Sequence, residues 1–247
     1  MYILAIETTG PFGSCALLDE NTGKIVASET STNNMSHLSD LVPMVERMLT
    51  KAGAKKSEIE YVAPSVGPGS FTGIRIGVCT ARALAQTLGI KAIPVGTLDA
   101  MLYKTVPDGV SEYATKVGIL NARRGQVYGI IQGNLDSGAY MLDDVLEVLI
   151  EDVIIDGEEV VFYGDGIDAY QDKIREVLDR YHAKYTFAGE DIRYQDAESV
   201  AKLAYLLKGH GVWVDVEDLF PDYMREAEAE TKLKAGALPI CHGPKQE

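Results

Sequence analysis

A glycine-rich string at residues 67–77 is the part of the chain whose composition most directly suggests chemistry. It reads Gly-Pro-Gly-Ser-Phe-Thr-Gly-Ile-Arg-Ile-Gly and lies between an expected strand and an expected helix. Glycines permit positive φ angles and close backbone approach, and the free N–H groups at a helix start attract anions. The string follows neither the Walker spacing nor the dinucleotide-binding spacing. A phosphate loop and a tight turn under a small-residue helix therefore both remain open.

Side chains with the spacing of a catalytic or metal site are not apparent. His37 with Asp40 supplies at most two ligands, whereas a zinc site needs three or four, and the other three histidines are scattered. Cys79 lacks a recognisable base partner, and no histidine–aspartate set can be assigned to Ser70. We expect no catalytic residue and no metal ligand, and the sequence gives no support for a protease.

Two short segments of the second half are further candidates for binding. Arg123 and Arg124 form a basic pair in an expected turn between strands, where they contact an anion or a partner's acid, or are simply solvated. Residues 164–166, Gly-Asp-Gly, follow an expected strand, and a loop of this kind can approach a nucleotide closely. Because the motif is short and common, it is weak evidence alone.

The bulk composition narrows the class of protein. Lys and Arg total 23 against 37 Asp and Glu, a formal charge of −14. Capture of nucleic acid draws much of its affinity from Lys and Arg contacts to phosphate, so we do not expect direct tRNA capture. The three cysteines have no disulfide or CxxC spacing, and the first residues lack a signal-peptide pattern. With no membrane-length apolar run, a cytoplasmic location is expected.

The pattern of strands and turns occurs twice along the chain. Apolar or alternating runs at 2–6, 14–18 and 24–29 are separated by glycine-containing turns, and the same order returns at 116–120, 127–132 and 139 onward. This predicts an α/β, duplicated two-lobe fold of the actin-like (ASKHA, ribonuclease-H-like) kind, with mixed sheets flanked by helices. We expect lobes at 1–105 and 106–230, followed by a flexible tail at 231–247.

Two helices are expected in the first lobe. In the first, apolar residues from Leu38 to Ala52 recur at helical spacing. The second runs from near Thr72 to Leu88, and its many small residues allow another backbone to come close; Cys79, like Cys15, is interpreted as a small core residue. Two helices of this kind could form a four-helix contact with a similar lobe.

Taken as a whole, the eleven-residue glycine-rich string is highly specific, and on this string the chain resembles the TsaB (YeaZ) family. Further matching stretches are Ile3-Leu4-Ala5-Ile6-Glu7-Thr8, 94–98, 122–128 and Pro221-Asp222-Tyr223-Met224-Arg225. The resemblance extends in order from residue 1 to about residue 230. Two departures stand out: the family commonly has Asp at the positions of Glu7 and Asn121. Loss of the charge at Asn121 weakens the case for metal–nucleotide chemistry in the second lobe.

The resemblance implies a non-catalytic subunit of the bacterial tRNA threonylcarbamoyladenosine machinery. Such a subunit pairs with TsaD through the two helices of its first lobe. The interface residues expected here are Leu38, Leu41, Val45, Met48, Gly73, Ile74, Gly77, Thr80, Ala81 and Leu84. The subunit works with the ATPase TsaE, meets tRNA only through the complex, and forms a homodimer when isolated. TsaD is known for a metal-binding histidine pair; only His37 is present in the matching region here. No cofactor is expected on the chain itself, although a nucleotide at the partner interface stays open.

A rival interpretation is an actin-like ATPase or small-molecule kinase with its own nucleotide cleft. It places magnesium–ATP on residues of the strand ends and glycine loops, which the family interpretation treats as vestigial. These candidate nucleotide-binding residues are Thr8, Thr9, Gly67, Gly69, Ser70, Gly164, Asp165 and Gly166.

Overall fold

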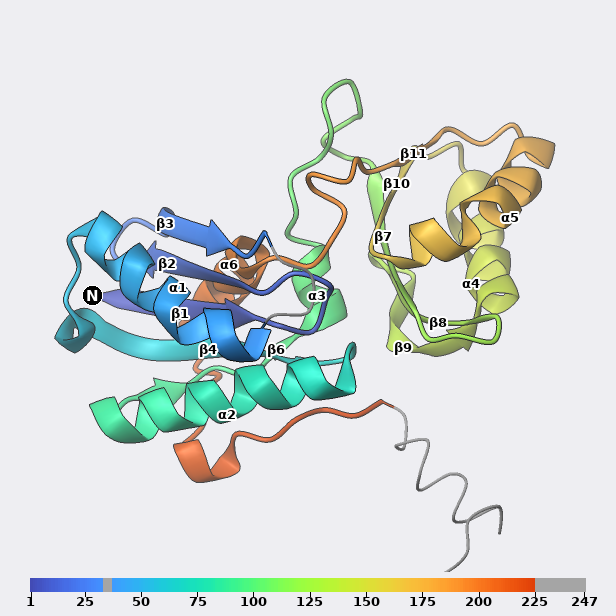
Figure 1. Ribbon diagram of the computed structural model, residues 1–247. Coiled ribbons are helices and arrows are strands. Elements are labelled where there is room, and N and C mark those ends of the chain that lie inside the picture. Colours follow the sequence, from blue (N-terminus) through green and yellow to red (C-terminus); the bar gives the residue numbers. More distant parts are fainter. Residues whose placement is uncertain (33–36, 225–247) are drawn as a thin grey trace, which may run out of the picture.

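The computed structural model describes residues 1–32 and 37–224, which form two α/β lobes joined by two connecting segments (Figure 1). The first lobe contains the strands β1 (Tyr2–Glu7), β2 (Ser14–Asp19), β3 (Lys24–Thr30), β4 (Ile59–Gly67), β5 (Lys91–Ala92) and β6 (Val95–Gly96), with the helices α1 (His37–Ala52), α2 (Phe71–Leu88) and α3 (Thr97–Met101). A 3-10 turn, η1 (Lys56–Glu58), precedes β4.

The second lobe repeats this order. Its strands are β7 (Thr115–Asn121), β8 (Gln126–Ile131), β9 (Leu135–Met141), β10 (Val160–Tyr163) and β11 (Tyr185–Phe187), and its helices are α4 (Leu142–Leu149) and α5 (Gly166–Arg180). A π-helical turn at Ile150–Ile154 continues α4. The described part of the chain ends with the helix α6 (Ala197–Gly209) and the 3-10 turn η3 (Val216–Asp218).

The two sheets have the same topology. The first has the strand order β3-β2-β1-β4-β5, with β6 added beside β4, and the second has the order β9-β8-β7-β10-β11. In each, three antiparallel strands are followed by two parallel ones. A helix connects the third strand to the fourth, and another connects the fourth to the fifth. The predicted duplicated actin-like fold with mixed sheets is confirmed.

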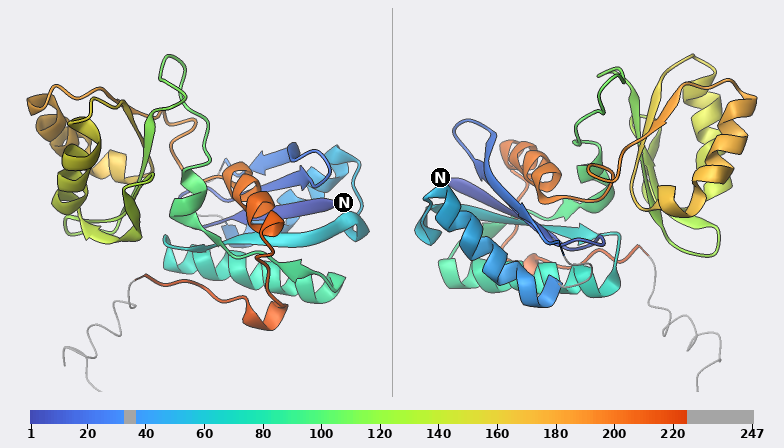
Figure 2. Two further views of the ribbon diagram at one scale, coloured as in Figure 1. Left: turned by 180° about the vertical axis from the view of Figure 1, so that it is seen from behind. Right: turned by 45° about the horizontal axis from the view of Figure 1, so that its top comes forward.

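Both faces of the first sheet are covered, which explains why β1 is a continuous apolar run. Leu4 and Ile6 face a core formed with α1 and α2. Ile3 and Ala5 face the opposite core, which is completed by Val200 of α6 and its neighbours. Figure 2 shows α6 on the side of the sheet away from α1 and α2.

The position of α6 differs from the expected division of the chain at residue 105. The second lobe was expected to extend over 106–230, yet α6 packs on the first sheet and Leu219 is fully buried in the core under α2. Conversely, α3 lies within the expected first lobe, yet its Leu98 and Met101 pack against Leu120 and other residues of the second lobe. The expected tail, 231–247, lies outside the described residues.

The second helix begins and ends as its residues dictate. Ser70 is the N-cap, and its Oγ accepts a hydrogen bond from the Gly73 N–H at 3.2 Å. Gly89 ends the helix in the left-handed conformation at φ 67°.

Among the described residues, no helix is both long enough and apolar enough to span a bilayer.

Candidate functional site

The glycine-rich turn between β4 and α2 is packed against the chain itself. A Cβ on Gly67 would lie 2.1 Å from the Asp222 carbonyl oxygen, and one on Gly69 would lie 2.7 Å from the Cβ of Thr9. The Ser70 N–H donates to the Thr9 carbonyl oxygen at 2.8 Å. The glycines therefore make room for neighbouring backbone, which favours the interpretation of this string as a tight turn.

The small residues of α2 have a similar explanation. A Cβ on Gly73 would lie 1.9 Å from the Thr8 carbonyl oxygen, and one on Gly77 would lie 2.4 Å from Thr8 Oγ1. Thr8 Oγ1 in turn donates to the Gly73 carbonyl oxygen at 2.8 Å. The close approach that these glycines permit is therefore to the end of β1.

Most of the residues predicted to contact a partner are instead part of the lobe's own core. The side chains of Leu41, Val45, Met48, Ile74 and Ala81 are at most 5% exposed, because they face the sheet. Gly73 and Gly77 are also buried. These seven positions are corrected: the apolar stripe of an amphipathic helix faces its own sheet and cannot reach a partner.

The outward faces of the same helices carry a different set of residues. Of the predicted interface residues, Thr80 and Leu84 are half-buried, and the side chain of Leu38 lies outside the described residues. Cys79, interpreted as a core residue, is exposed, whereas Cys15 is buried as predicted. Ala83 is also exposed, and on α1 Val42 is 51% exposed.

Glu7 at the end of β1 is buried and fully engaged. Its two carboxylate oxygens accept hydrogen bonds from the Thr9 N–H and from the Ser65 hydroxyl. Burial raises the pKa of the Glu7 carboxyl, and the hydrogen bonds from Ser65 and Thr9 oppose that shift. The neighbouring Thr8 is itself buried, so this acid acts as a support for the turn that carries both threonines.

A cleft of about 410 Å³ separates the two lobes near the start of α2. Four of the candidate nucleotide residues line it: Thr9, Gly69 and Ser70 from the first lobe and Asp165 from the second. The other four, Thr8, Gly67, Gly164 and Gly166, are not among the residues that line this cleft.

The wall of the cleft in the second lobe is held by hydrogen bonds to Asn121. Its N–H donates to Asp165 Oδ1 at 3.0 Å, and its side-chain oxygen accepts from the Arg123 N–H at 2.8 Å. Burial raises the pKa of Asp165, and the hydrogen bond from Asn121 opposes that shift. Asn121 thus fixes this turn through both its backbone N–H and its side-chain oxygen.

The basic pair lies in a tight turn at the mouth of the cleft. Arg123 and Arg124 have φ angles of 65° and 55°, and Gly125 follows at 77°. Arg123 lines the cleft, while Arg124 is exposed and has further interactions. Within the described residues, no group of three His, Cys, Asp or Glu side chains is placed to hold a metal ion.

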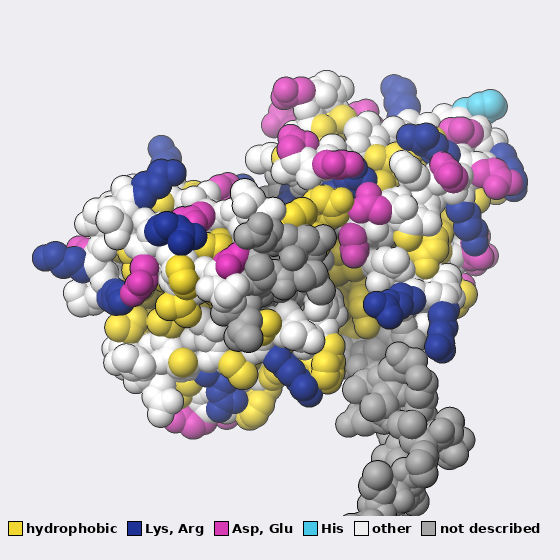
Figure 3. All heavy atoms as spheres, viewed as in Figure 1, with side chains coloured by type: hydrophobic (Ala, Val, Ile, Leu, Met, Phe, Trp, Pro, Cys, Tyr) yellow, Lys and Arg dark blue, Asp and Glu magenta, His cyan; other side chains and the backbone are white. Residues whose placement is uncertain are grey.

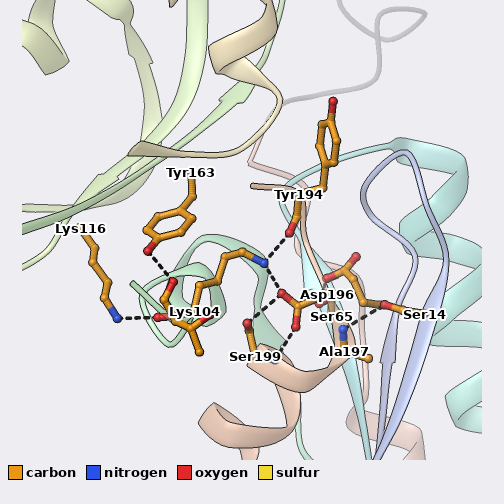
Figure 4. Close-up of polar contacts among 11 residues, drawn as sticks. Ser14, Ser65, Lys104, Lys116, Tyr163, Tyr194, Asp196, Ala197 and Ser199 are labelled. Atoms are coloured by element: carbon orange, nitrogen blue, oxygen red, sulfur yellow. Dashed lines mark hydrogen bonds and ion pairs between the residues drawn. The ribbon is translucent and has the colours of Figure 1, made fainter. Parts of the chain in front are cut away.

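An ion pair in the hinge between the lobes was not predicted. Lys104 on the first connecting segment is 5% exposed; its ammonium contacts Asp196 on the second and donates to the Tyr194 carbonyl oxygen at 2.6 Å (Figure 4). Burial acts to raise the pKa of Asp196, but the charge and hydrogen bond of Lys104, together with the hydrogen bonds from Ser199, outweigh it and lower the pKa. The two residues are far apart in sequence, so no local pattern could have paired them.

The second lobe contacts the same connecting segment. Lys116 Nζ donates to the carbonyl oxygens of Leu102 and Lys104 at 2.8 and 2.7 Å, and the Tyr163 hydroxyl donates to that of Thr105 at 2.8 Å. Figure 4 shows these side chains converging on the segment from the strands of the second lobe. These polar contacts at the connecting segments add to the apolar packing of Leu98 and Met101 against the second lobe in holding the two lobes together.

Comparisons with known proteins support the resemblance proposed from the sequence. The profile described as TsaD, tRNA N6-adenosine threonylcarbamoyltransferase, matches residues 24–233. The tRNA threonylcarbamoyladenosine biosynthesis protein TsaB of Bacillus subtilis is 31% identical over 240 residues, which cover 94% of this chain and 97% of the relative. The TsaB of Escherichia coli is 29% identical over 242 residues, covering 94% and 98%.

The solved structures point to the same relatives. A Pseudomonas aeruginosa protein, described as similar to the peptidase YeaZ, superposes with a TM-score of 0.72 at 24% identity. The superposition covers 91% of this chain and 99% of the other, and it supports the fold. From the match along almost the whole sequence, the chain belongs to the TsaB (YeaZ) family.

Proposed function

We propose that this chain is a non-catalytic cytoplasmic subunit that binds TsaD and supports transfer of a threonylcarbamoyl group to the adenosine beside the anticodon of tRNA. The observation that carries the proposal is the 31% identity, over 97% of its length, to a protein named for tRNA threonylcarbamoyladenosine biosynthesis. The ATPase TsaE is proposed as the third component. Contact with tRNA would then occur only within the complex, in keeping with the charge of −14.

The state of the strand ends supports a role without chemistry of its own. Both carboxylate oxygens of Glu7 accept hydrogen bonds, from Thr9 and Ser65, and the side-chain oxygen of Asn121 accepts one from the Arg123 N–H. Neither group presents a free carboxylate to the cleft. The alternative of an actin-like ATPase or kinase needs such carboxylates to hold a metal–nucleotide, so the family interpretation is favoured.

The outer face of α2 is the surface that we propose for partner binding. Cys79, Ala83 and Thr87 are exposed there and small, and the helix carries no acidic residue. Hydrophobic side chains gather over α1 and α2 in the front view (Figure 3). Small side chains let a second helix approach closely. The same face would pair two copies about a two-fold axis when TsaD is absent, and a nucleotide at this interface remains a proposal.

The test is complex formation with the TsaD of the same organism, measured by size-exclusion chromatography with light scattering. Ala83→Arg adds a long charged side chain to the proposed face, so the complex should be lost while the chain stays folded. Ala139→Arg, the same change at an exposed position on β9 of the second lobe, is the matched control and should bind like wild type. Threonylcarbamoyl transfer to tRNA by TsaD should follow the same pattern.

Two results would count against the proposal. If wild type and TsaD elute separately under conditions where each is folded, this chain is not the partner subunit. If the isolated chain hydrolyses ATP or phosphorylates a small molecule with turnover, the chain is an enzyme, and the interpretation as an actin-like ATPase or kinase is favoured instead.

A further inference from the structure

Two stretches far apart in the sequence meet at the start of α2. The rings of Phe71 and Tyr223 lie 4.7 Å apart between their centroids. The guanidinium carbon of Arg75 lies 4.0 Å from the Phe71 centroid and 5.9 Å from that of Tyr223. Arg75 Nε donates a hydrogen bond to the Tyr223 hydroxyl at 3.0 Å. We call these three residues the arginine clamp; they join the glycine-rich string to residues 221–224, which belong to the second stretch singled out by sequence.

The segment that carries Tyr223 is firmly attached to the first lobe. The Asp222 N–H donates to the Val66 carbonyl oxygen at 2.8 Å, and the Leu219 side chain is fully buried. Arg82, further along α2, donates to the Leu219 carbonyl oxygen at 3.2 Å. With the backbone just before Tyr223 held against the first lobe, the clamp holds the guanidinium in one orientation.

The clamp is nevertheless on the surface. Phe71 is 37% exposed and Tyr223 38%, and Arg75 is exposed between them. Within residues 1–32 and 37–224, no carboxylate lies within ion-pair distance of Arg75, whereas Arg47, Arg180 and Arg193 each contact an acid. In that part of the chain, Arg75 hydrogen-bonds through its Nε alone, to the Tyr223 hydroxyl.

We propose that the arginine clamp receives a carboxylate side chain of the protein partner that docks along the outer face of α2. A guanidinium binds a carboxylate through two parallel hydrogen bonds, and its stacking on aromatic rings pre-organises it. Arg and Tyr are also among the residue types that dominate binding energy at interfaces. Because the clamp is already ordered, little side-chain entropy is lost on binding.

Charge decides between a protein carboxylate and an RNA phosphate as the ligand. The segment beside the clamp carries Glu217, Asp218 and Asp222, and the whole chain carries −14. These acids repel any anion, but an RNA backbone carries a charge at every nucleotide, and its affinity depends on several cationic contacts that one arginine does not supply. A single carboxylate with apolar surface around it fits one isolated arginine between two rings. The inference rests on the proposed function, because the partner it names is the protein that binds α2.

The test compares Arg75→Lys with wild type for binding to the purified TsaD of the same organism, by isothermal titration calorimetry. Lys keeps the charge but loses the planar pair of donors. Hydrogen bonds to charged groups contribute enough that the loss should weaken binding by about tenfold to a hundredfold. Tyr223→Phe, which removes only the hydroxyl that orients Arg75, should weaken it less. Arg180→Lys at the end of α5 is the matched control and should bind like wild type.

Each other outcome has a definite meaning. If wild type binds TsaD and Arg75→Lys binds equally well, the clamp inference is wrong while the proposed function stands. If wild type does not bind TsaD, the proposed function fails and the inference fails with it. If Arg75→Lys lowers the unfolding midpoint enough to account for its binding loss, the clamp only fastens the segment to α2. If it weakens tRNA binding by the isolated chain instead, the ligand is a phosphate and the proposal is overturned.

Discussion

Substituting Gly77 by Ala tests whether the small residues of α2 serve the lobe's own packing or a partner. The added Cβ would lie 2.4 Å from Thr8 Oγ1, a separation that atoms do not tolerate. Either Thr8 turns away and its 2.8 Å hydrogen bond to the Gly73 carbonyl oxygen breaks, or α2 moves off the sheet. The expected result is a less stable protein.

The magnitude follows from three contributions. Overpacking of a close contact costs about 1–3 kcal/mol, and the lost hydrogen bond contributes about 1 kcal/mol. Replacing Gly by Ala inside a helix returns about 1 kcal/mol. The free energy of unfolding should therefore fall by about 1–3 kcal/mol, measured by urea denaturation with an unchanged m-value.

Two controls isolate the contact with Thr8. Gly209→Ala at the end of α6 makes the same chemical change where no atom lies within 4 Å of the new Cβ, so the protein should not be destabilised. In a Thr8→Ala background, the hydroxyl is gone and the nearest remaining atoms are Thr8 Cβ at 3.6 Å and Ile6 Cγ2 at 3.8 Å. There, Gly77→Ala should cost at least about 1 kcal/mol less than in wild type, a coupling that a double-mutant cycle measures.

One result would refute this reasoning. Helix propensity alone predicts that Gly77→Ala is as stable as wild type or more stable. If that is found and only binding to TsaD is weakened, then Gly77 belongs to the partner interface, as the sequence analysis first predicted.

Two further predictions concern the hinge and the cysteines. Asp196→Asn should lower stability at neutral pH by about 3 kcal/mol, because it leaves the Lys104 ammonium buried without its counter-ion. The folded-state pKa of Asp196 is lowered below 3.8. The stabilisation from this ion pair is therefore complete above about pH 4 and is lost as the pH falls through the folded-state pKa. Acid titration followed by circular dichroism should show a smaller loss of stability in the variant than in wild type. Burial raises the pKa of Cys15 to about 12, so maleimide at pH 7 should spare Cys15 until urea unfolds the chain. Cys79 is exposed on the single chain, so it should react in a sample diluted to the monomer, as peptide mass spectrometry would detect.

Sequence predicts an amphipathic face more reliably than what that face contacts. The helical spacing of Leu41, Val45 and Met48 correctly marks one buried stripe on α1, but the same spacing serves a helix packed on its own sheet or on another protein. The duplicated strand order was predictable because turns and apolar runs are local. The wrong assignment of Gly73 and Gly77 to the interface arose because their small size was attributed to a partner rather than to the close approach of Thr8.

The features that the sequence could not predict join distant positions. Lys104 and Asp196 meet only because both connecting segments cross between the lobes at the same place. Likewise, Tyr223 lies against Phe71 only after the chain has returned past α2. Neither pair has a periodicity or a spacing that could reveal it. The string 221–225 was recognisable by resemblance, although nothing in it indicated which helix it would contact.

The return of α6 to the first sheet has a consequence for synthesis on the ribosome. The face formed by Ile3, Ala5 and Ala16 is covered mainly by α6, with Ala100 of α3 beside it, and α6 begins 101 residues after the end of β6 at Gly96. At about 5–20 residues per second, this face stays open for roughly 5–20 s after the rest of its sheet has emerged. A nascent chain with an apolar sheet face exposed for that time is a natural client for a chaperone that binds at the tunnel exit.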